Sequence, residues 1–253
     1  MGKLAEQARR DFLKQSVSAG AVATIAPGVF LSTVAQAEPR AEAVSDEVRW
    51  GMLIDTAKCA SGCSDCVSAC DKENGLDLLV KPEGAKEEQW SQQRPHWIRQ
   101  VTLKDNLSGR ETNLPLMCQH CEKPPCEDVC PTGASFKRAD GIVMVDRHIC
   151  IGCRYCMMAC PYKARSFIHE NIQAQRVTAP RGKVCVESCT LCVHRLDNGQ
   201  TTTACQDACT HGAIVFGDLN DPNSSVSQAL KEYSSVQIRP DLKLNPGVRY
   251  TNI

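Results

Sequence analysis

Closely spaced cysteines between Cys118 and Pro161 constrain this sequence more than any other feature. The second of two runs there has the spacing C-x2-C-x2-C-x3-C-P and consists of Cys150, Cys153, Cys156, Cys160 and Pro161. The run before it has the spacing C-x2-C-x4-C-x3-C-P and consists of Cys118, Cys121, Cys126, Cys130 and Pro131. Thiols this crowded do not easily find separate disulfide partners, so we expect them to share bound metal.

The spacing selects iron–sulfur clusters among the metal centres. It is the run with which bacterial ferredoxins bind 4Fe-4S clusters, where three cysteines hold one cubane and the fourth reaches the neighbouring one. Zinc sites also use C-x2-C pairs, but they do not require a C-x3-C-P ending in each run. Disulfides compete with this interpretation if the chain enters an oxidising compartment. We therefore predict that the two runs form one two-cluster unit.

Two further runs bring the predicted number of clusters to four. The first run, with the spacing C-x3-C-x2-C-x3-C, consists of Cys59, Cys63, Cys66 and Cys70, and Asp71 replaces its proline. The last run, with the spacing C-x2-C-x12-C-x3-C, consists of Cys189, Cys192, Cys205 and Cys209. The first run is the weakest match, and we expect Gly62 to absorb its additional residue through an unusual backbone angle. Aromatic residues make up only 5% of the chain, so cluster binding is expected to contribute to folding.

The cross-over rule predicts which cysteines share a cluster. The runs pair first with fourth and second with third, which places four clusters in a row. The four predicted ligand sets are Cys59, Cys63, Cys66 with Cys209; Cys189, Cys192, Cys205 with Cys70; Cys118, Cys121, Cys126 with Cys160; and Cys150, Cys153, Cys156 with Cys130. Cys185 is the one of 17 cysteines left over. We interpret it as a buried thiol, with a role as substitute ligand for Cys59 as the alternative.

The N-terminus has the features of an export signal. Arg9-Arg10 precede a weakly apolar stretch from Ser16 to Val34, and Ala35-Gln36-Ala37 form a cleavage site. This predicts a twin-arginine signal peptide over residues 1–37 and a periplasmic mature protein. Retention as a membrane anchor is the alternative, although Ser, Thr, Gly and Pro dilute the apolar stretch.

The remaining sequence predicts an α+β fold of two pseudo-symmetric bacterial ferredoxin-like (βαβ) modules. Short apolar segments predict strands, with turns at Asn106–Gly109 and Ala139–Gly141, over residues 50–55, 101–103, 114–117, 134–137, 142–145 and 164–168. Each C-x3-C is expected on the first turn of a short helix. The similarity of 208–213 (ACTHGA) to 129–134 (VCPTGA) supports two related modules.

These elements divide the chain into a signal peptide, a linker, one cluster domain and a tail. The predicted boundaries are 1–37, 38–48, 49–216 and 217–253, with an insertion at 71–117 that carries a β-hairpin. The insertion is either ordinary packing or a docking surface for a partner, and both interpretations stay open. The tail is predicted to be an extended arm. The chain has 29 lysines and arginines and 29 aspartates and glutamates. It therefore has no net positive charge that would indicate nucleic-acid binding.

Three stretches extend the pattern into a family resemblance: MCQHCEKPPCEDVCPTGA, ICIGCRYCMMACPYKAR and CTLCVHR…ACQDACTHGAIVFGDLNDP. They resemble the four-cluster iron–sulfur subunits of respiratory membrane complexes, such as polysulfide, dimethyl sulfoxide, tetrathionate and formate-dependent nitrite reductases. The export signal, the lack of a C-terminal anchor and the CPYKARSF stretch are most similar to the DsrO type, the periplasmic subunit of the membrane complex linked to dissimilatory sulfite reduction. The resemblance implies an integral membrane, quinone-reactive partner of the NrfD type and a multihaem cytochrome c.

The expected function is electron transfer through four 4Fe-4S clusters between those partners. The sequence shows no nucleophile motif, nucleotide-binding loop or pterin-binding length, so no catalytic residue is expected. One alternative is the iron–sulfur subunit of a tetrathionate, polysulfide or nitrite reductase. A second is a self-contained reductase with an incompletely ligated cluster at Cys59, and a third is a disulfide-rich binding protein without metal.

Overall fold

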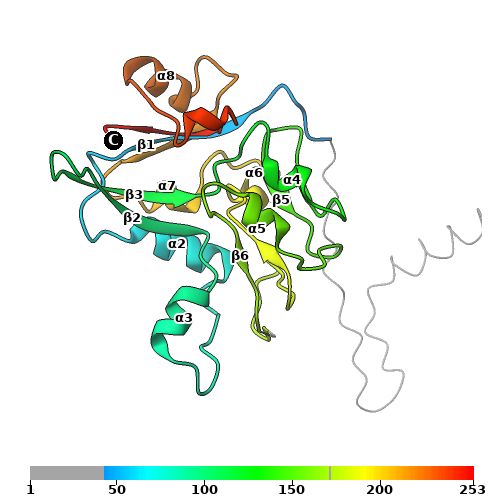
Figure 1. Ribbon diagram of the computed structural model, residues 1–253. Coiled ribbons are helices and arrows are strands. Elements are labelled where there is room, and N and C mark those ends of the chain that lie inside the picture. Colours follow the sequence, from blue (N-terminus) through cyan, green and yellow to red (C-terminus); the bar gives the residue numbers. More distant parts are fainter. Residues whose placement is uncertain (1–42, 171) are drawn as a thin grey trace, which may run out of the picture. The chain divides into compact units, whose positions relative to one another are not determined.

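The computed structural model describes residues 43–170 and 172–253 (Figure 1). The predicted signal peptide, residues 1–37, and the first part of the linker lie outside this range. The described residues form short helices and four small sheets, which is an α+β architecture. Within the described part, no helix is both long and apolar enough to cross a membrane.

A three-stranded sheet with the order β8-β1-β9 joins the two ends of the described chain. β1 (Trp50–Asp55) pairs antiparallel with β8 (Ile214–Asp218) and parallel with β9 (Val248–Thr251). β1 is central, so its residues 51–54 are buried on both faces. Gly51 is needed there because a Cβ atom would lie 2.7 Å from the carbonyl oxygen of Gly247.

The segment after β8 is not the extended arm that the sequence predicts. It forms α8 (Ser225–Glu232), which packs on β8 and β1 (Figure 1), then a short 3-10 helix (Pro240–Leu242), and ends in β9. The Ser224 hydroxyl accepts the Ser227 N–H at 3.2 Å and caps α8. Tyr250 of β9 is fully buried, so apolar burial holds this segment against the domain.

Four short helices carry the C-x3-C portions of the cysteine runs. They are α2 (Asp65–Asn74), α4 (Pro125–Asp128), α5 (Tyr155–Ala159) and α7 (Ala204–Asp207). α2 packs against α7 and α4 against α5, so the helices pair first with fourth and second with third. α2 ends at Gly75, whose left-handed φ of 67° lets its N–H reach the Asp71 carbonyl.

The other elements are small hairpins and two peripheral helices. In the insertion, α3 (Glu87–Gln93) precedes the hairpin of β2 (Ile98–Lys104) and β3 (Glu111–Met117), which is longer than the predicted strands. β4 (Ser135–Lys137) pairs with β5 (Val143–Val145), and β6 (Ser166–Phe167) pairs with β7 (Val186–Glu187), both antiparallel. α6 (Val193–Asp197) lies in the long gap of the fourth run. The chain order β5-α5-β6 gives the expected strand–helix–strand sequence around the third run.

Candidate cluster-binding site

The cysteines of the four runs come together in four groups, each with three cysteines of one run and the last cysteine of another. Three groups line cavities with empty space of about 320, 310 and 300 Å³, and we name these groups A, C and D. Group A is Cys59, Cys63, Cys66 and Cys209; group C is Cys118, Cys121, Cys126 and Cys160; group D is Cys130, Cys150, Cys153 and Cys156. Group B is Cys70, Cys189, Cys192 and Cys205, which surround one another. These are the four sets into which the cross-over rule sorts the cysteines.

The groups form a row in the order A, B, C, D. Three pairs of thiols from neighbouring groups interact electrostatically and indicate this order: Cys66 with Cys205, Cys189 with Cys118, and Cys156 with Cys126. All cysteines of B and C are buried, whereas Cys59 and Cys63 of A are half-buried and Cys153 of D is exposed. The row therefore runs through the interior and approaches solvent at both ends.

The irregular first run reaches its group without help from Cys185. Gly62 adopts a left-handed φ of 78°, as expected for the residue that absorbs the wider gap, and Cys59 lines the same cavity as Cys63. Cys185 is buried elsewhere, where its thiol donates to the Arg147 carbonyl at 3.3 Å and lies against Cys150 of group D. The structure thus places Cys59, and not Cys185, beside the other cysteines of group A.

A second glycine brings a covering segment close to group D. Gly152, between Cys150 and Cys153, has a φ of 70°, and a Cβ atom there would lie 2.2 Å from the Val184 carbonyl oxygen. Only glycine fits this approach. The segment that contains Val184 and Cys185 consequently lies directly on group D.

Backbone N–H groups donate to cysteine sulfurs at the two similar segments 129–134 and 208–213. The Ser135 N–H donates to Cys130 Sγ at 3.3 Å, and the Ala213 N–H donates to Cys209 Sγ at 3.2 Å. Both turns contain a glycine with positive φ, Gly133 and Gly212. The internal similarity of the sequence thus corresponds to a similar local hydrogen-bonding arrangement, which favours ionised sulfur.

Amide side chains donate to two further sulfurs. Gln100 of β2 donates through Nε2 to the Cys63 carbonyl at 3.0 Å and to Cys66 Sγ at 3.6 Å. Asn74 of α2 donates through Nδ2 to Cys70 Sγ at 3.5 Å. The insertion therefore contributes a donor to group A, in addition to any surface role.

An ion-pair network ties the first run to the fourth. Arg195 of α6 binds Glu73 of α2 through two hydrogen bonds of 2.7 Å, and it also pairs with Asp207 at 2.7 Å. His194 lies 2.7 Å from the same Glu73 carboxylate. The Arg195 hydrogen bonds lower the pKa of Glu73 to about 2, so the carboxylate stays charged and holds α2 to α6.

Burial makes four of the grouped thiols hard to ionise. It raises the pKa of Cys66, Cys118, Cys121 and Cys192 to about 12. A metal that binds these thiols has to displace their protons and compensates the charge of the thiolates. Among residues 43–170 and 172–253, no three His, Cys, Asp or Glu side chains are placed to hold a single metal ion. The thiolates of a cubane each bind a separate iron, which requires a wider spacing.

Two buried side chains lie beside group C: Arg165, which the sequence does not identify as functional, and His120, whose position within the C-x2-C of the second run indicates only a place near the cluster. Arg165 is 6% exposed, and its Nη2 donates to Cys126 Sγ at 3.0 Å. His120 is also buried; its Nδ1 accepts the Val143 N–H at 3.0 Å, so its Nε2 carries the proton. Burial lowers the pKa of His120 to about 3. The one signal for Arg165 is its place in the CPYKARSF stretch.

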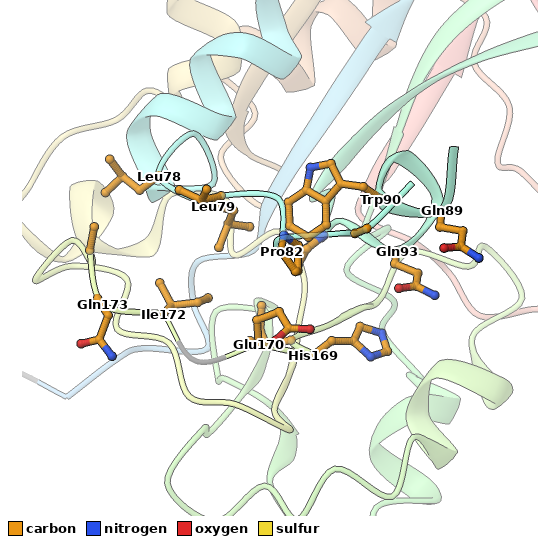
Figure 2. Close-up of a pocket in the computed structure, with 15 residues that line it drawn as sticks. Leu78, Leu79, Pro82, Gln89, Trp90, Gln93, His169, Glu170, Ile172 and Gln173 are labelled. Atoms are coloured by element: carbon orange, nitrogen blue, oxygen red, sulfur yellow. The ribbon is translucent and has the colours of Figure 1, made fainter. Parts of the chain in front are cut away.

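A larger cavity lies away from the cysteines. It has a volume of about 360 Å³ and lies between the insertion and the segment after β6, and Figure 2 shows Trp90 and Pro82 across from His169 and Glu170. Trp90 of α3 is half-buried, whereas Trp97, four residues after α3, is 2% exposed in the core. The insertion thus combines a tryptophan packed in the core with an accessible cavity that a second tryptophan lines.

Comparison with known proteins gives consistent matches. A model of the 4Fe-4S dicluster domain matches residues 111–219. The iron–sulfur subunit 1 of an Hdr-like menaquinol oxidoreductase from Archaeoglobus fulgidus is 39% identical, over 97% of this chain and 98% of that protein. A tetrathionate reductase subunit of Salmonella typhimurium is 34% identical over 98% and 89% of the two chains. The iron–sulfur cluster-binding subunit of a menaquinone reductase from Nitratidesulfovibrio vulgaris is 33% identical over 81% and 89%.

Proposed function

Because the chain belongs to the family of iron–sulfur electron-transfer subunits with a 4Fe-4S dicluster domain, we propose that it carries four 4Fe-4S clusters, one on each cysteine group. The observation that carries the proposal is the row of groups A to D, buried in the middle and open to solvent at both ends. In this proposal the sixteen cysteines of the four runs are the iron ligands. Cys185 is a neighbouring thiol.

The ligand sets favour electron transfer over catalysis at a cluster. Each group offers four thiols, one for each iron of a cubane. Substrate binding would need an iron with an open coordination position. A self-contained reductase predicts that substrate oxidises the isolated, pre-reduced subunit, whereas a subunit that only transfers electrons stays inert without its partners.

The surroundings of the two ends differ, and this difference suggests which partner each end meets. The run that supplies group D is flanked by exposed apolar side chains, which we call the apolar rim: Ile149, Ile151, Tyr155, Met158 and Val184. Exposed apolar patches of this kind mark interaction sites. Group A is flanked by exposed polar residues, Lys58, Asp65 and His211. We assign the group D end to an integral membrane, quinone-reactive subunit of the NrfD type and the group A end to a multihaem cytochrome c or a reductase.

The proposed location is the periplasm, through the twin-arginine signal at residues 1–37. The proposed complex is the Dsr membrane complex linked to sulfite reduction, based on the export signal and the CPYKARSF stretch. The alternative is the corresponding subunit of a tetrathionate, polysulfide or nitrite reductase. The tetrathionate reductase subunit that is 34% identical to this chain supports that alternative.

Affinity purification of the full chain from detergent-solubilised membranes of its own organism tests the proposal. The expected result is a complex with a multi-span membrane protein and a haem protein, in which quinol reduces the iron–sulfur clusters. A pterin-containing catalytic subunit in place of the cytochrome would select the reductase alternative. Recovery of the chain alone, in the soluble fraction, would contradict the partner assignment. An Arg9→Lys, Arg10→Lys variant that still reached the periplasm would contradict the proposed export route.

A further inference from the structure

Arg165 is a buried cation whose side chain donates a hydrogen bond to a cysteine sulfur. It follows Ala164 in the segment after Pro161, and only 6% of its surface is exposed. Its Nη2 donates to Cys126 Sγ at 3.0 Å, and its Nη1 is buried without a partner among the described residues. Arg165 also lines the cavity of group C.

The titratable groups around Arg165 are the neutral imidazole of His120 and thiols from two neighbouring groups of the row. The thiols are Cys126 and Cys118 of group C and Cys156 of group D. Within residues 43–170 and 172–253, the structure records no carboxylate in an ion pair with Arg165. By contrast, the buried Arg181 pairs with Glu187 at 3.1 Å.

A guanidinium stays charged in proteins, and burial without a compensating charge is costly. Neutral thiols do not supply that compensation. A cubane with four thiolate ligands does, because it carries net negative charge in both of its working oxidation states. The burial of Arg165 is therefore stable when group C holds a cluster.

The same interaction acts on the oxidation state of that cluster. Reduction adds one negative charge, and a cation at hydrogen-bonding distance from a ligand sulfur stabilises the reduced form more than the oxidised form. Cys126 accepts a hydrogen bond from the Arg165 guanidinium, whereas Cys156 of group D interacts with it only electrostatically. Groups A and B have no recorded hydrogen bond from Arg165.

Group B, the other buried group, has a different environment. The hydrogen bond to Cys70 Sγ comes from the neutral amide of Asn74, at 3.5 Å. Asp71 lies next to Cys70 and is ion-paired with Arg94 at 2.6 Å, so the cation there is already balanced. The other cation near group B is Arg195, which interacts with Cys192 and is paired with Glu73 and Asp207 at 2.7 Å. Both cations near group B are therefore balanced by carboxylates, unlike Arg165 at group C.

We propose that Arg165 raises the reduction potential of the group C cluster relative to that of the group B cluster. Of the two buried clusters, group C then takes up an electron more readily. This inference rests on the proposed function, because it requires clusters on groups B and C.

Anaerobic redox titration of the full chain, followed by EPR, tests the proposal with Arg165→Gln and Arg165→Met. The expected result is one component whose midpoint potential falls clearly, a second that falls less, and two that stay at the wild-type values. Arg110→Gln is the matched control, because Arg110 is exposed on the β2–β3 hairpin and its loss removes the same charge. Four unchanged midpoints in the Arg165 variants, at wild-type iron content, would overturn the proposal, as would a rise in any midpoint.

If both neutral variants lose iron, Arg165→His provides the test, because its charge can be removed by raising the pH. The midpoint of the component assigned to group C is then expected to fall below the wild-type value once the imidazole is neutral. Four midpoints that match the wild type at every pH in a fully loaded Arg165→His protein would overturn the proposal. Wild-type protein with almost no iron would instead overturn the proposed function itself, which separates the two failures.

Discussion

The thiol of Cys70, the last cysteine of the first run, interacts electrostatically with that of Cys189, the first cysteine of the fourth run. Cys66, one turn earlier on the same helix, belongs to group A. One short helix therefore serves two neighbouring groups, and α2 holds them at a fixed separation. The same holds for α4, where Cys126 belongs to group C and the following Cys130 to group D.

Because the two cysteines of α2 belong to different groups, single substitutions of each should damage different clusters. Cys70→Ala should damage the cluster of group B and Cys66→Ala that of group A, each with a three-iron EPR signal in the oxidised protein. A soluble paramagnetic complex should relax the Cys66→Ala signal more strongly, because Cys59 and Cys63 of group A are half-buried whereas group B is buried. Identical signals with identical relaxation would mean that both cysteines hold the same cluster.

Gln100 should raise the potential of the group A cluster. Its hydrogen bond to Cys66 Sγ, at 3.6 Å, favours the more negative reduced state, so Gln100→Leu should lower one midpoint by the equivalent of about 1 kcal/mol. Redox titration measures the shift, with the exposed Gln200 replaced by Leu as the control. A shift of the same size in both variants would assign the effect to something other than this hydrogen bond.

The apolar rim should be needed for membrane attachment but not for cluster binding. Met158 is 64% exposed beside group D, so Tyr155→Ser with Met158→Ser should weaken membrane association roughly tenfold or more, because apolar contacts are lost. Leu107→Ser is the control, since Leu107 is 99% exposed on the β2–β3 turn. Co-sedimentation with membranes and iron content are the two measurements. Undiminished sedimentation of the double variant would contradict the assignment of group D to the membrane side.

Tyr250 should be essential for the stability of the domain. Its hydroxyl donates to the Pro115 carbonyl and accepts from Gln119 Nε2, both at 3.1 Å. We expect Tyr250→Ala to lower the free energy of unfolding by about 3–5 kcal/mol and Tyr250→Phe by about 1 kcal/mol. Anaerobic urea unfolding followed by circular dichroism gives both values. An unchanged midpoint in Tyr250→Ala would mean that the C-terminal segment is not part of the folded domain.

Spacing predicts the placement of the cysteines well, because neighbours such as Cys150 and Cys153 are constrained locally. The strand at Trp50–Asp55 and the two hairpin turns were also predictable, since a short apolar segment, the glycine-ended sequence 106–109 or the Asp140-Gly141 pair determines them within a few residues. The paired order of the helices followed from the cross-over rule.

Long-range partners could not be predicted in the same way. Val248–Thr251 is too short to indicate a strand, and it becomes one only because β1, almost two hundred residues earlier, offers a free edge. Arg165 would ordinarily be placed at the surface, and only the sulfur of Cys126 explains its burial. The position of Cys185 beside Cys150 likewise depends on the approach of its segment to Gly152.

Iron and acid-labile sulfide content of anaerobically purified full chain, combined with EPR of the oxidised and reduced forms, tests the central claim most directly. Four complete cubanes predict about sixteen irons and as many sulfides per chain, no three-iron signal when oxidised, and interacting signals when reduced. About fifteen irons with a three-iron signal would leave one group, first of all group A, without a complete cluster. Almost no iron in protein that was never exposed to air would contradict the account.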